Sequence, residues 1–393
     1  MNMQYRMDMK SGNKLSVIGF GCMRFPRDLA QIDINRTEQL IIKAVQEGIN
    51  YFDTAYAYGG SEDVLGQILA KNNLRSRIFL ATKLPLDKCG SYDDFESLFQ
   101  EQLKRLHTDY IDYYLLHNLF DMNLWKSLCA LGIEKWINEK KESGRIKNIG
   151  FSFHGIHEEF LELLDSYNWD FCQIQYNYIN TNYQAGMGGL KKAAQKGLPV
   201  IIMEPLLGGK LATGLPKKAV AIFKEANNEL SPAAWALRWL WNQNEVTVVL
   251  SGMNEITQLE ENIETAQNAV PNMLTKAETD AYEAVIKIIT DSYKIPCTGC
   301  NYCLPCPQNV NISACFAAYN VSYVIGKVSG FLQYLTGTGA MEPKNNRSAS
   351  QCKECGACEK KCPQHIPIME SLKDVTERME PFFSVYAELA ADH

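Results

Sequence analysis

The sequence predicts an α/β protein in which a (β/α)8 TIM barrel is followed by a small, mostly helical domain rich in cysteine. Between residues 17 and 253, eight short β-rich runs alternate with stretches whose apolar residues recur at helical spacing. Eight strand-then-helix units favour a parallel sheet that closes on itself. An open doubly wound sheet is disfavoured because no Gly-x-Gly-x-x-Gly turn follows the first run. Nine of the 13 cysteines lie from Cys297 to Cys362, beyond the barrel.

The predicted strands are short and rich in β-branched and aromatic residues, as buried strands of a parallel sheet are. In chain order they are VIGFGCM (17–23), NYFDTA (50–55), IFLATKL (78–84), YIDYYLLH (110–117), IKNIGFSF (146–153), DFCQIQYN (170–177), PVIIMEP (199–205) and VTVVLSG (246–252).

Helices are expected between these strands, for example over residues 37–47 and 94–106, where apolar residues recur with helical period. Ser61, ahead of the VLGQIL run, is a residue type that favours a helix start. After the last strand, two helices over roughly 256–266 and 276–289 are expected to complete the barrel domain.

The chain of 393 residues exceeds the usual size of one domain, whereas about 250 residues suffice for a barrel. We expect a barrel domain over residues 1–290, a cysteine domain over 291–375 and a C-terminal tail over 376–393. Within the second domain, apolar residues at helical spacing from 312 to 335 predict one or two helices, and 336–350 is expected to be an exposed loop.

Charge and hydropathy exclude several kinds of partner. The formal net charge is −6 and no long basic run is present, so nucleic acid is not expected as a partner. The start, MNMQYRMDMK, lacks the apolar core of a secretory signal. The apolar stretch 321–335 is interrupted by Lys327 and Gln333 and is too short to span a bilayer. We therefore expect a cytoplasmic protein with no membrane partner.

Polar side chains follow three neighbouring strands of the predicted barrel. Asp53 and Tyr58 follow the second strand, Lys83 ends the third and His117 ends the fourth. In barrels of this kind the carboxyl ends of the strands carry the chemistry. Taken singly, the lysine could be a loop cation, the histidine a core residue and the tyrosine an aromatic plug, but their order at strand ends favours a catalytic group.

These residue types suit the reduction of a carbonyl group. Hydride addition leaves an alkoxide that needs a proton donor, and a phenol is a weak acid near neutrality unless its anion is stabilised. A buried Lys83 ammonium would lower the pKa of Tyr58. Asp53 would hold the lysine and balance its charge, and His117 would orient the carbonyl oxygen by a hydrogen bond.

The barrel region resembles the aldo-keto reductase superfamily over roughly residues 10–290. The run INYFDTAYAYGGSEDVLG (49–66) matches the family's strand-2 signature, and ATK (81–83), LLH (115–117) and GFS (150–152) follow in the family's order. The resemblance implies the catalytic tetrad Asp53, Tyr58, Lys83 and His117, and a nicotinamide coenzyme. It narrows to members that carry a C-terminal ferredoxin-like domain.

The same resemblance implies a set of coenzyme contacts. Ser152 and Gln173 would bind the nicotinamide carboxamide, although Phe153 stands where the family often has asparagine. Met203 takes the place of an aromatic ring that stacks on the nicotinamide. Gln258 stands where the family has an arginine for the 2′-phosphate, so both NADP and NAD stay open. The loops after strands 7 and 8 and the following helix supply the remaining contacts: Leu206, Gly208, Lys210, Ser251, Gly252 and Asn262.

Two cysteine motifs predict two [4Fe-4S] clusters. The first contains Cys297, Cys300, Cys303 and Cys306, and the second contains Cys352, Cys355, Cys358 and Cys362. The second has the C-x2-C-x2-C-x3-C-P spacing of bacterial two-cluster ferredoxins, in which the fourth cysteine ligates the other cluster. The first departs from it, since only two residues separate its last two cysteines.

The motif assigns the first cluster to Cys297, Cys300, Cys303 and Cys362, and the second to Cys352, Cys355, Cys358 and Cys306. Structural zinc is the alternative, but it rarely needs three cysteines in a row at this spacing. Cys315 lies on an apolar helical stripe and is expected in the core, as are the four lone cysteines Cys22, Cys89, Cys129 and Cys172.

The expected function is NAD(P)H-dependent reduction of a small-molecule carbonyl, or oxidation of the corresponding alcohol, with iron-sulfur clusters in the attached domain. Two alternatives stay open: a reductase whose clusters feed electrons from a ferredoxin or flavodoxin into the barrel, and a non-catalytic redox sensor. The sequence does not specify the substrate, the direction of reaction or the oligomeric state.

Overall fold

The computed structural model describes residues 3–29, 31–297, 299, 301–340, 346–362 and 364–383. Contacts divide the chain into two compact units. The first comprises Met1–Asn177, Met187–Pro205 and Ala233–Leu274, and the second comprises Tyr178–Gly186, Leu206–Pro232 and Thr275–His393. Two loops that follow barrel strands thus belong by their contacts to the second unit.

Eight parallel strands close into a barrel in the first unit, which confirms the predicted fold class. Each strand pairs with its neighbours in chain order, and the last pairs with the first. The strands are β3 (Ile18–Gly21), β6 (Tyr51–Asp53), β7 (Phe79–Pro85), β8 (Ile111–His117), β9 (Ile146–Phe153), β10 (Phe171–Gln175), β11 (Val200–Met203) and β12 (Val246–Ser251).

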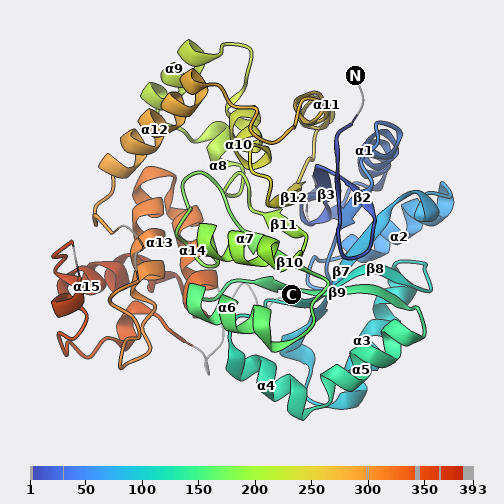
Figure 1. The fold of residues 1–393 in the computed structure, drawn as a ribbon, viewed down its shortest axis with the longest axis horizontal. Helices are drawn as coiled ribbons and strands as arrows, with labels where there is room; N and C mark the ends of the chain where they lie inside the picture. The colour runs from blue at the N-terminus through green and yellow to red at the C-terminus, as the bar shows by residue number, and fades with distance from the viewer. Residues whose placement is uncertain are drawn as a thin grey trace. The chain divides into compact units, whose positions relative to one another are not determined.

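Helices cover the outside of these strands (Figure 1). They are α1 (Ile34–Gln46), α2 (Ser61–Lys71), α3 (Tyr92–Arg105), α4 (Met122–Ala130), α5 (Ile133–Glu142), α6 (His157–Ser166), α7 (Gly186–Gln195), α10 (Pro232–Trp241) and α11 (Ile256–Ala266). Helix α2 begins at Ser61, but its N-cap is Gly60 in the left-handed region at φ 75°. The Ser61 hydroxyl instead donates to the Cys22 carbonyl oxygen at 2.9 Å, so it ties the helix to the end of β3.

An antiparallel pair of strands, β1 (Tyr5–Met7) and β2 (Lys14–Ser16), precedes the barrel in the chain. Its connecting loop carries the fully buried Asp8, which accepts a hydrogen bond from the Tyr113 hydroxyl of β8 at 2.7 Å. Tyr113 lies inside the barrel, where its ring contacts those of Tyr51 and Phe171 at centroid distances of 5.2 and 5.1 Å. The interior below the strand ends is therefore filled with aromatic side chains. A short pair, β4 (Arg27–Asp28) and β5 (Gln31–Ile32), follows β3.

The second unit contains six helices among its described residues: α8 (Lys210–Thr213), α9 (Lys217–Ala226), α12 (Lys276–Asp291), α13 (Ile312–Val324), α14 (Lys327–Thr338) and α15 (Ile368–Met379). Helices α13, α14 and α15 pack around an apolar core that includes Cys315, Phe316 and Tyr334. The core position expected for Cys315 is confirmed.

The expectation of an exposed loop over 336–350 is wrong in its described part. Helix α14 continues to Thr338, and Ser348 and Ala349 are buried. The Tyr334 hydroxyl accepts a hydrogen bond from the Ala349 amide at 2.7 Å, which draws this segment into the core. Helix α15 also extends beyond residue 375, to Met379. None of the helices in the described ranges is long and apolar enough to cross a membrane.

Candidate active site and iron-sulfur site

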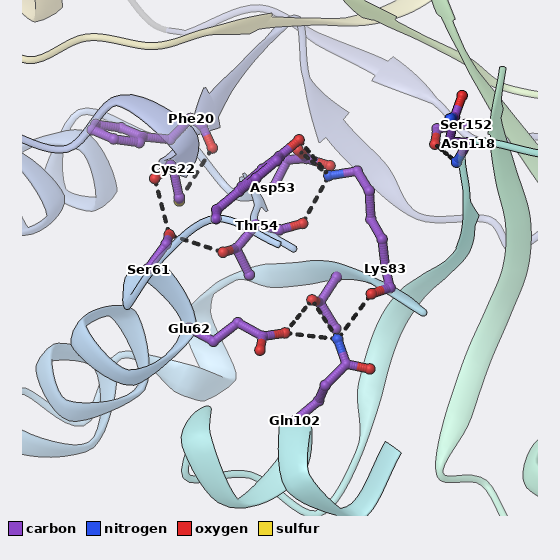
Figure 2. Close-up of polar contacts among 12 residues, drawn as sticks. Phe20, Cys22, Asp53, Thr54, Ser61, Glu62, Lys83, Gln102, Asn118 and Ser152 are labelled. Atoms are coloured by element: carbon purple, nitrogen blue, oxygen red, sulfur yellow. Dashed lines mark hydrogen bonds and ion pairs between the residues drawn. The ribbon is translucent and has the colours of Figure 1, made fainter. Parts of the chain in front are cut away.

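Lys83 lies at the centre of a buried polar group inside the first unit (Figure 2). Its Nζ donates to Asp53 Oδ1 and to the Thr54 carbonyl oxygen, both at 2.7 Å, and lies 3.3 Å from the Tyr58 hydroxyl oxygen. The Lys83 and Asp53 side chains are only 1% and 3% exposed. Two buried charges are tolerated only when they are paired and hydrogen-bonded, so this ion pair requires one defined geometry.

The register of the strands brings these groups together. Strand β6 ends at Asp53, which lies opposite Ala81 of β7, and Lys83 follows two residues later with its side chain on the same face. Strand β7 continues to Pro85, so Lys83 lies just inside the strand rather than at its end as expected. His117 ends β8 opposite Pro85.

Tyr58 and His117 complete the expected group. Tyr58 lies in the turn between β6 and α2, and its ring meets that of His117 edge-on, with centroids 6.1 Å apart. The Lys83 ammonium lies 4.7 Å from the centroid of the Tyr58 ring. The structure thus brings all four predicted residues together at one end of the barrel.

The pKa of Tyr58 differs from the expectation. Burial raises the pKa of the Tyr58 phenol above its ordinary value, and the positive charge of Lys83 offsets only part of this effect. Burial also opposes the charged form of Lys83, but Asp53 and Tyr58 outweigh it and raise the pKa of the ammonium. Lys83 thus acts on the Tyr58 pKa in the predicted direction, but burial outweighs it, and near neutrality the site holds a protonated lysine and a protonated phenol.

His117 is uncharged in this environment. Burial lowers the pKa of His117 to about 3, and the nearby charges of Lys83 and His154 act in the same direction. A neutral imidazole carries one N–H donor and one acceptor nitrogen. His117 can therefore donate a single hydrogen bond to a carbonyl oxygen without acting as an acid near neutrality.

A second buried network supports Lys83 from the other side of β7 (Figure 2). The Gln102 amide of α3 donates to Glu62 Oε1 at 2.7 Å, to Thr82 Oγ1 at 3.1 Å and to the Lys83 carbonyl oxygen at 3.0 Å. The Tyr114 hydroxyl in turn donates to Gln102 Oε1 at 2.6 Å. Sequence reasoning did not identify Glu62 or Gln102, although Glu62 lies within the signature run 49–66.

Two of the expected coenzyme contacts lie side by side. Ser152 of β9 and Gln173 of β10 are paired in register, and each is 1% exposed. The Ser152 hydroxyl accepts a hydrogen bond from the backbone N–H of Asn118 at 2.8 Å. Gln173 Oε1 is buried and has no hydrogen-bond partner among the described residues. A buried acceptor normally has a partner, so this amide fits a ligand with an N–H donor, such as a carboxamide.

The remaining expected contacts divide between the two units. Met203 ends β11, and Ser251 ends β12, where its hydroxyl accepts from Asn262 Nδ2 at 3.1 Å. Gln258 is exposed, and its side-chain oxygen accepts a hydrogen bond from the backbone N–H of Asn254 at 3.0 Å. Gly252 lies close to the side chain of Arg24: a Cβ added at Gly252 would be only 3.1 Å from Arg24 Cδ. The other three, Leu206, Gly208 and Lys210, belong to the second unit.

Cysteines from both motifs meet at one cavity in the second unit. The cavity is lined by Cys297 and Cys303 of the first motif and by Cys362 of the second. Apolar side chains, including Ile312 and Phe316 of α13, form much of its wall. Cys300 lies outside the described residues. The three described thiols fit the cysteine ligation of a [4Fe-4S] cluster, and their origin matches the first predicted ligand set.

Three cysteines of the second predicted set also lie near one another. Burial raises the pKa of the Cys358 thiol, and the neighbouring thiols Cys306 and Cys352 add to that effect. Cys306 and Cys352 pack against the same apolar core as Cys358, whereas Cys355 is exposed. The structure therefore places the last cysteine of the first motif beside the second motif.

The four lone cysteines only partly match the expectation of buried positions. Cys22 and Cys172 are buried, but Cys89 and Cys129 are half-exposed. Cys22 lies close to Asp53, whose charge adds to burial in raising the pKa of the Cys22 thiol.

Comparisons with known proteins agree with this geometry. Among curated proteins, methylglyoxal reductase YeaE of Escherichia coli K12 is 28% identical over 267 residues, which is 63% of this chain and 84% of that protein. L-glyceraldehyde 3-phosphate reductase of the same organism is 26% identical over 329 residues, 72% of this chain and 93% of that protein. The solved holo form of an aldo-keto reductase from Bacillus halodurans has a TM-score of 0.60 at 25% identity, over 72% of this chain and 96% of that chain.

Family models match both parts of the chain. The model of the aldo/keto reductase family matches residues 17–284, more than half of the sequence. The model of the 4Fe-4S dicluster domain matches residues 296–366. With a closed parallel barrel and its polar group at the strand ends, this chain belongs to the aldo/keto reductase family and carries a 4Fe-4S dicluster domain after its reductase domain.

Proposed function

We propose that this oxidoreductase reduces a small-molecule carbonyl, or oxidises the corresponding alcohol, at Asp53, Tyr58, Lys83 and His117. The observation that carries the proposal is the buried Lys83 ammonium, in contact with both the Asp53 carboxylate and the Tyr58 hydroxyl. When bound, the nicotinamide supplies a hydride to the carbonyl carbon. The names of the relatives, methylglyoxal reductase and L-glyceraldehyde 3-phosphate reductase, support a short carbonyl compound as the substrate.

Tyr58 is the proposed proton donor. The phenol is protonated near neutrality and can protonate the developing alkoxide, and the Lys83 ammonium offsets part of the rise in the Tyr58 pKa that burial causes. The tyrosinate left behind faces the Lys83 ammonium, and attraction between the two charges is strong in a buried site. Asp53 keeps the ammonium in place and charged, and neutral His117 donates a hydrogen bond that orients the carbonyl oxygen.

The coenzyme is proposed to be NADP or NAD, with its carboxamide bound by Ser152 and by the unpartnered amide oxygen of Gln173. The other proposed contacts are Met203, Leu206, Gly208, Lys210, Ser251, Gly252, Gln258 and Asn262. We further propose a barrel domain over residues 1–290, a cluster domain over 291–375 and a tail over 376–393.

Two [4Fe-4S] clusters are proposed in the second domain, with ligands exchanged between the motifs. Cys297, Cys300, Cys303 and Cys362 would hold the first cluster, and Cys306, Cys352, Cys355 and Cys358 the second. The cavity lined by thiols of both motifs supports this exchange. Such clusters transfer single electrons.

Replacement of Tyr58 by phenylalanine tests the catalytic proposal. Tyr58→Phe should lose carbonyl reduction by roughly 10²–10⁴-fold, because general-acid catalysis is removed. Its affinity for the coenzyme, measured by fluorescence quenching, should be unchanged. Tyr56→Phe, two residues away, is the matched control and should keep full activity. Full activity of Tyr58→Phe would remove that phenol from the reaction.

The lowered pKa of His117 predicts how stability depends on pH. Between pH 6.5, the ordinary value, and about 3, the unfolded chain binds a proton that the folded protein does not bind. This group therefore lowers the free energy of unfolding as the pH falls through that window. His117→Gln should reduce the proton uptake on unfolding by up to about one proton. Exposed His107→Gln is the control. If the free energy of unfolding changes with pH equally in His117→Gln and in wild type, a neutral His117 is contradicted.

The cluster assignment predicts about eight iron and eight sulfide per chain after anaerobic purification. Cys306→Ala should damage the cluster of residues 352–358 and spare the first, and Cys362→Ala should do the reverse. Electron paramagnetic resonance of the reduced variants distinguishes the two clusters. If Cys306→Ala and Cys300→Ala lose the same cluster, each motif ligates its own cluster and the exchange is refuted.

A second candidate function is electron transfer from a ferredoxin or flavodoxin through the clusters to the barrel. It is favoured by Gln258, which stands in place of a phosphate-binding arginine and whose side chain is engaged by the Asn254 amide. We expect NADPH or NADH, added without oxygen, to bleach the cluster absorbance if the two cofactors share one electron path. Bound nucleotide without bleaching would favour separate roles.

A further inference from the structure

The loop after the sixth barrel strand has an unusual position in the chain. Residues 178–186, here called the strap, follow β10 and lead into α7, yet by their contacts they belong to the second unit with the cysteine domain. Loops at this end of barrel strands build active sites. Gln173, the proposed carboxamide contact, lies in β10 just upstream of the strap.

Helix α14 is shaped around a side chain of the strap. Tyr183 is 8% exposed, and its hydroxyl donates to the Gln333 carbonyl oxygen at 3.2 Å. One turn later stands Gly337, where an added Cβ would lie 2.1 Å from the Tyr183 hydroxyl oxygen. Real Cβ atoms essentially never lie this close to another atom, so a side chain at position 337 would displace the Tyr183 hydroxyl.

The strap also backs onto the first cysteine motif. Gly299 lies between Cys297 and Cys300 with φ of 70°, a conformation that favours glycine. A Cβ added there would lie 3.3 Å from both the Cβ and the carbonyl oxygen of Asn182. Gly299, which stands between two proposed ligands of the first cluster in the sequence, is thus in close contact with the strap.

The start of the strap is held in the same unit. Tyr178 is 1% exposed, and its ring contacts Phe223 of α9 and Tyr282 of α12 at centroid distances of 6.3 and 5.9 Å. The strap is therefore anchored at Tyr178, at Asn182 and at Tyr183, all within the second unit.

We propose that the strap couples assembly of the first cluster to coenzyme binding in the barrel, with Asn182 and Tyr183 as positioning residues. The inference rests on the proposed first cluster and the proposed role of Gln173. A cluster bound at Cys297, Cys300 and Cys303 fixes the turn around Gly299, which supports the strap. The strap is covalently continuous with β10, so the chain itself links the turn around Gly299 to the strand that carries Gln173.

Gly337→Ala tests this coupling without touching a proposed ligand. The new methyl group displaces the Tyr183 hydroxyl and breaks its hydrogen bond. We expect hydrogen exchange in residues 178–186 to rise, and coenzyme affinity and cluster lifetime in air to fall, each by roughly two- to tenfold. Tyr183→Phe combined with Gly337→Ala removes the atom that clashes and should recover part of the loss. Leu332→Ala, at an exposed position of the same helix, is the control.

A second variant tests the reverse direction. Cys297→Ser should lose the first cluster, measured as iron per chain, and should raise exchange in the strap and weaken coenzyme binding by a similar factor. If the cluster is lost while exchange in the strap and coenzyme affinity stay at wild-type values, the coupling is refuted. If wild-type protein binds neither NADPH nor NADH, the proposed function fails, whereas the exchange and iron measurements still decide whether cluster and strap are linked.

Discussion

The ammonium of Lys83, enclosed inside the barrel, is the constraint on which the site depends. An unpaired buried charge would cost several kcal/mol, and removal of one partner of such a pair typically costs about 3–5 kcal/mol. Asp53, the Thr54 carbonyl oxygen and the Tyr58 hydroxyl surround it. A change in the register of β6 against β7, or in the turn after β6, would therefore separate the ammonium from these partners. The same contacts that satisfy the charge place an acid next to it.

The sequence alone predicted that Asp53, Tyr58, Lys83 and His117 lie together, because strand order in a barrel determines which strand ends are neighbours. It did not predict Gln102, which lies on α3 and contacts Glu62, 40 residues away in the chain. Helical periodicity predicts that Gln102 lies in a helix, but it does not show that its side-chain amide donates to three acceptors. The net rise of the Tyr58 pKa was not predicted either, because burial outweighs the lowering effect of Lys83 and only the packed structure defines that balance.

Cysteine spacing predicted the ligands of both proposed clusters, and thiols from both motifs line one cavity. The strap could not be predicted in the same way. Its residues form neither a strand nor a periodic helix, and their contacts reach Gly299 and Gly337, more than 100 positions later in the chain. Both glycines look like ordinary loop or helix residues in the sequence. Their importance lies in the side chains that approach them.

The packed interior of the barrel has a consequence for access to the site. Tyr51, Tyr113 and Phe171 lie among aliphatic side chains below the strand ends, and the Tyr113 hydroxyl is held by the buried Asp8 of the preceding loop. The interior of a barrel of this kind is a packed core and not a pore. Small molecules therefore reach Asp53 and Lys83 from the end of the barrel at which these strands finish, and substrate and product use the same route.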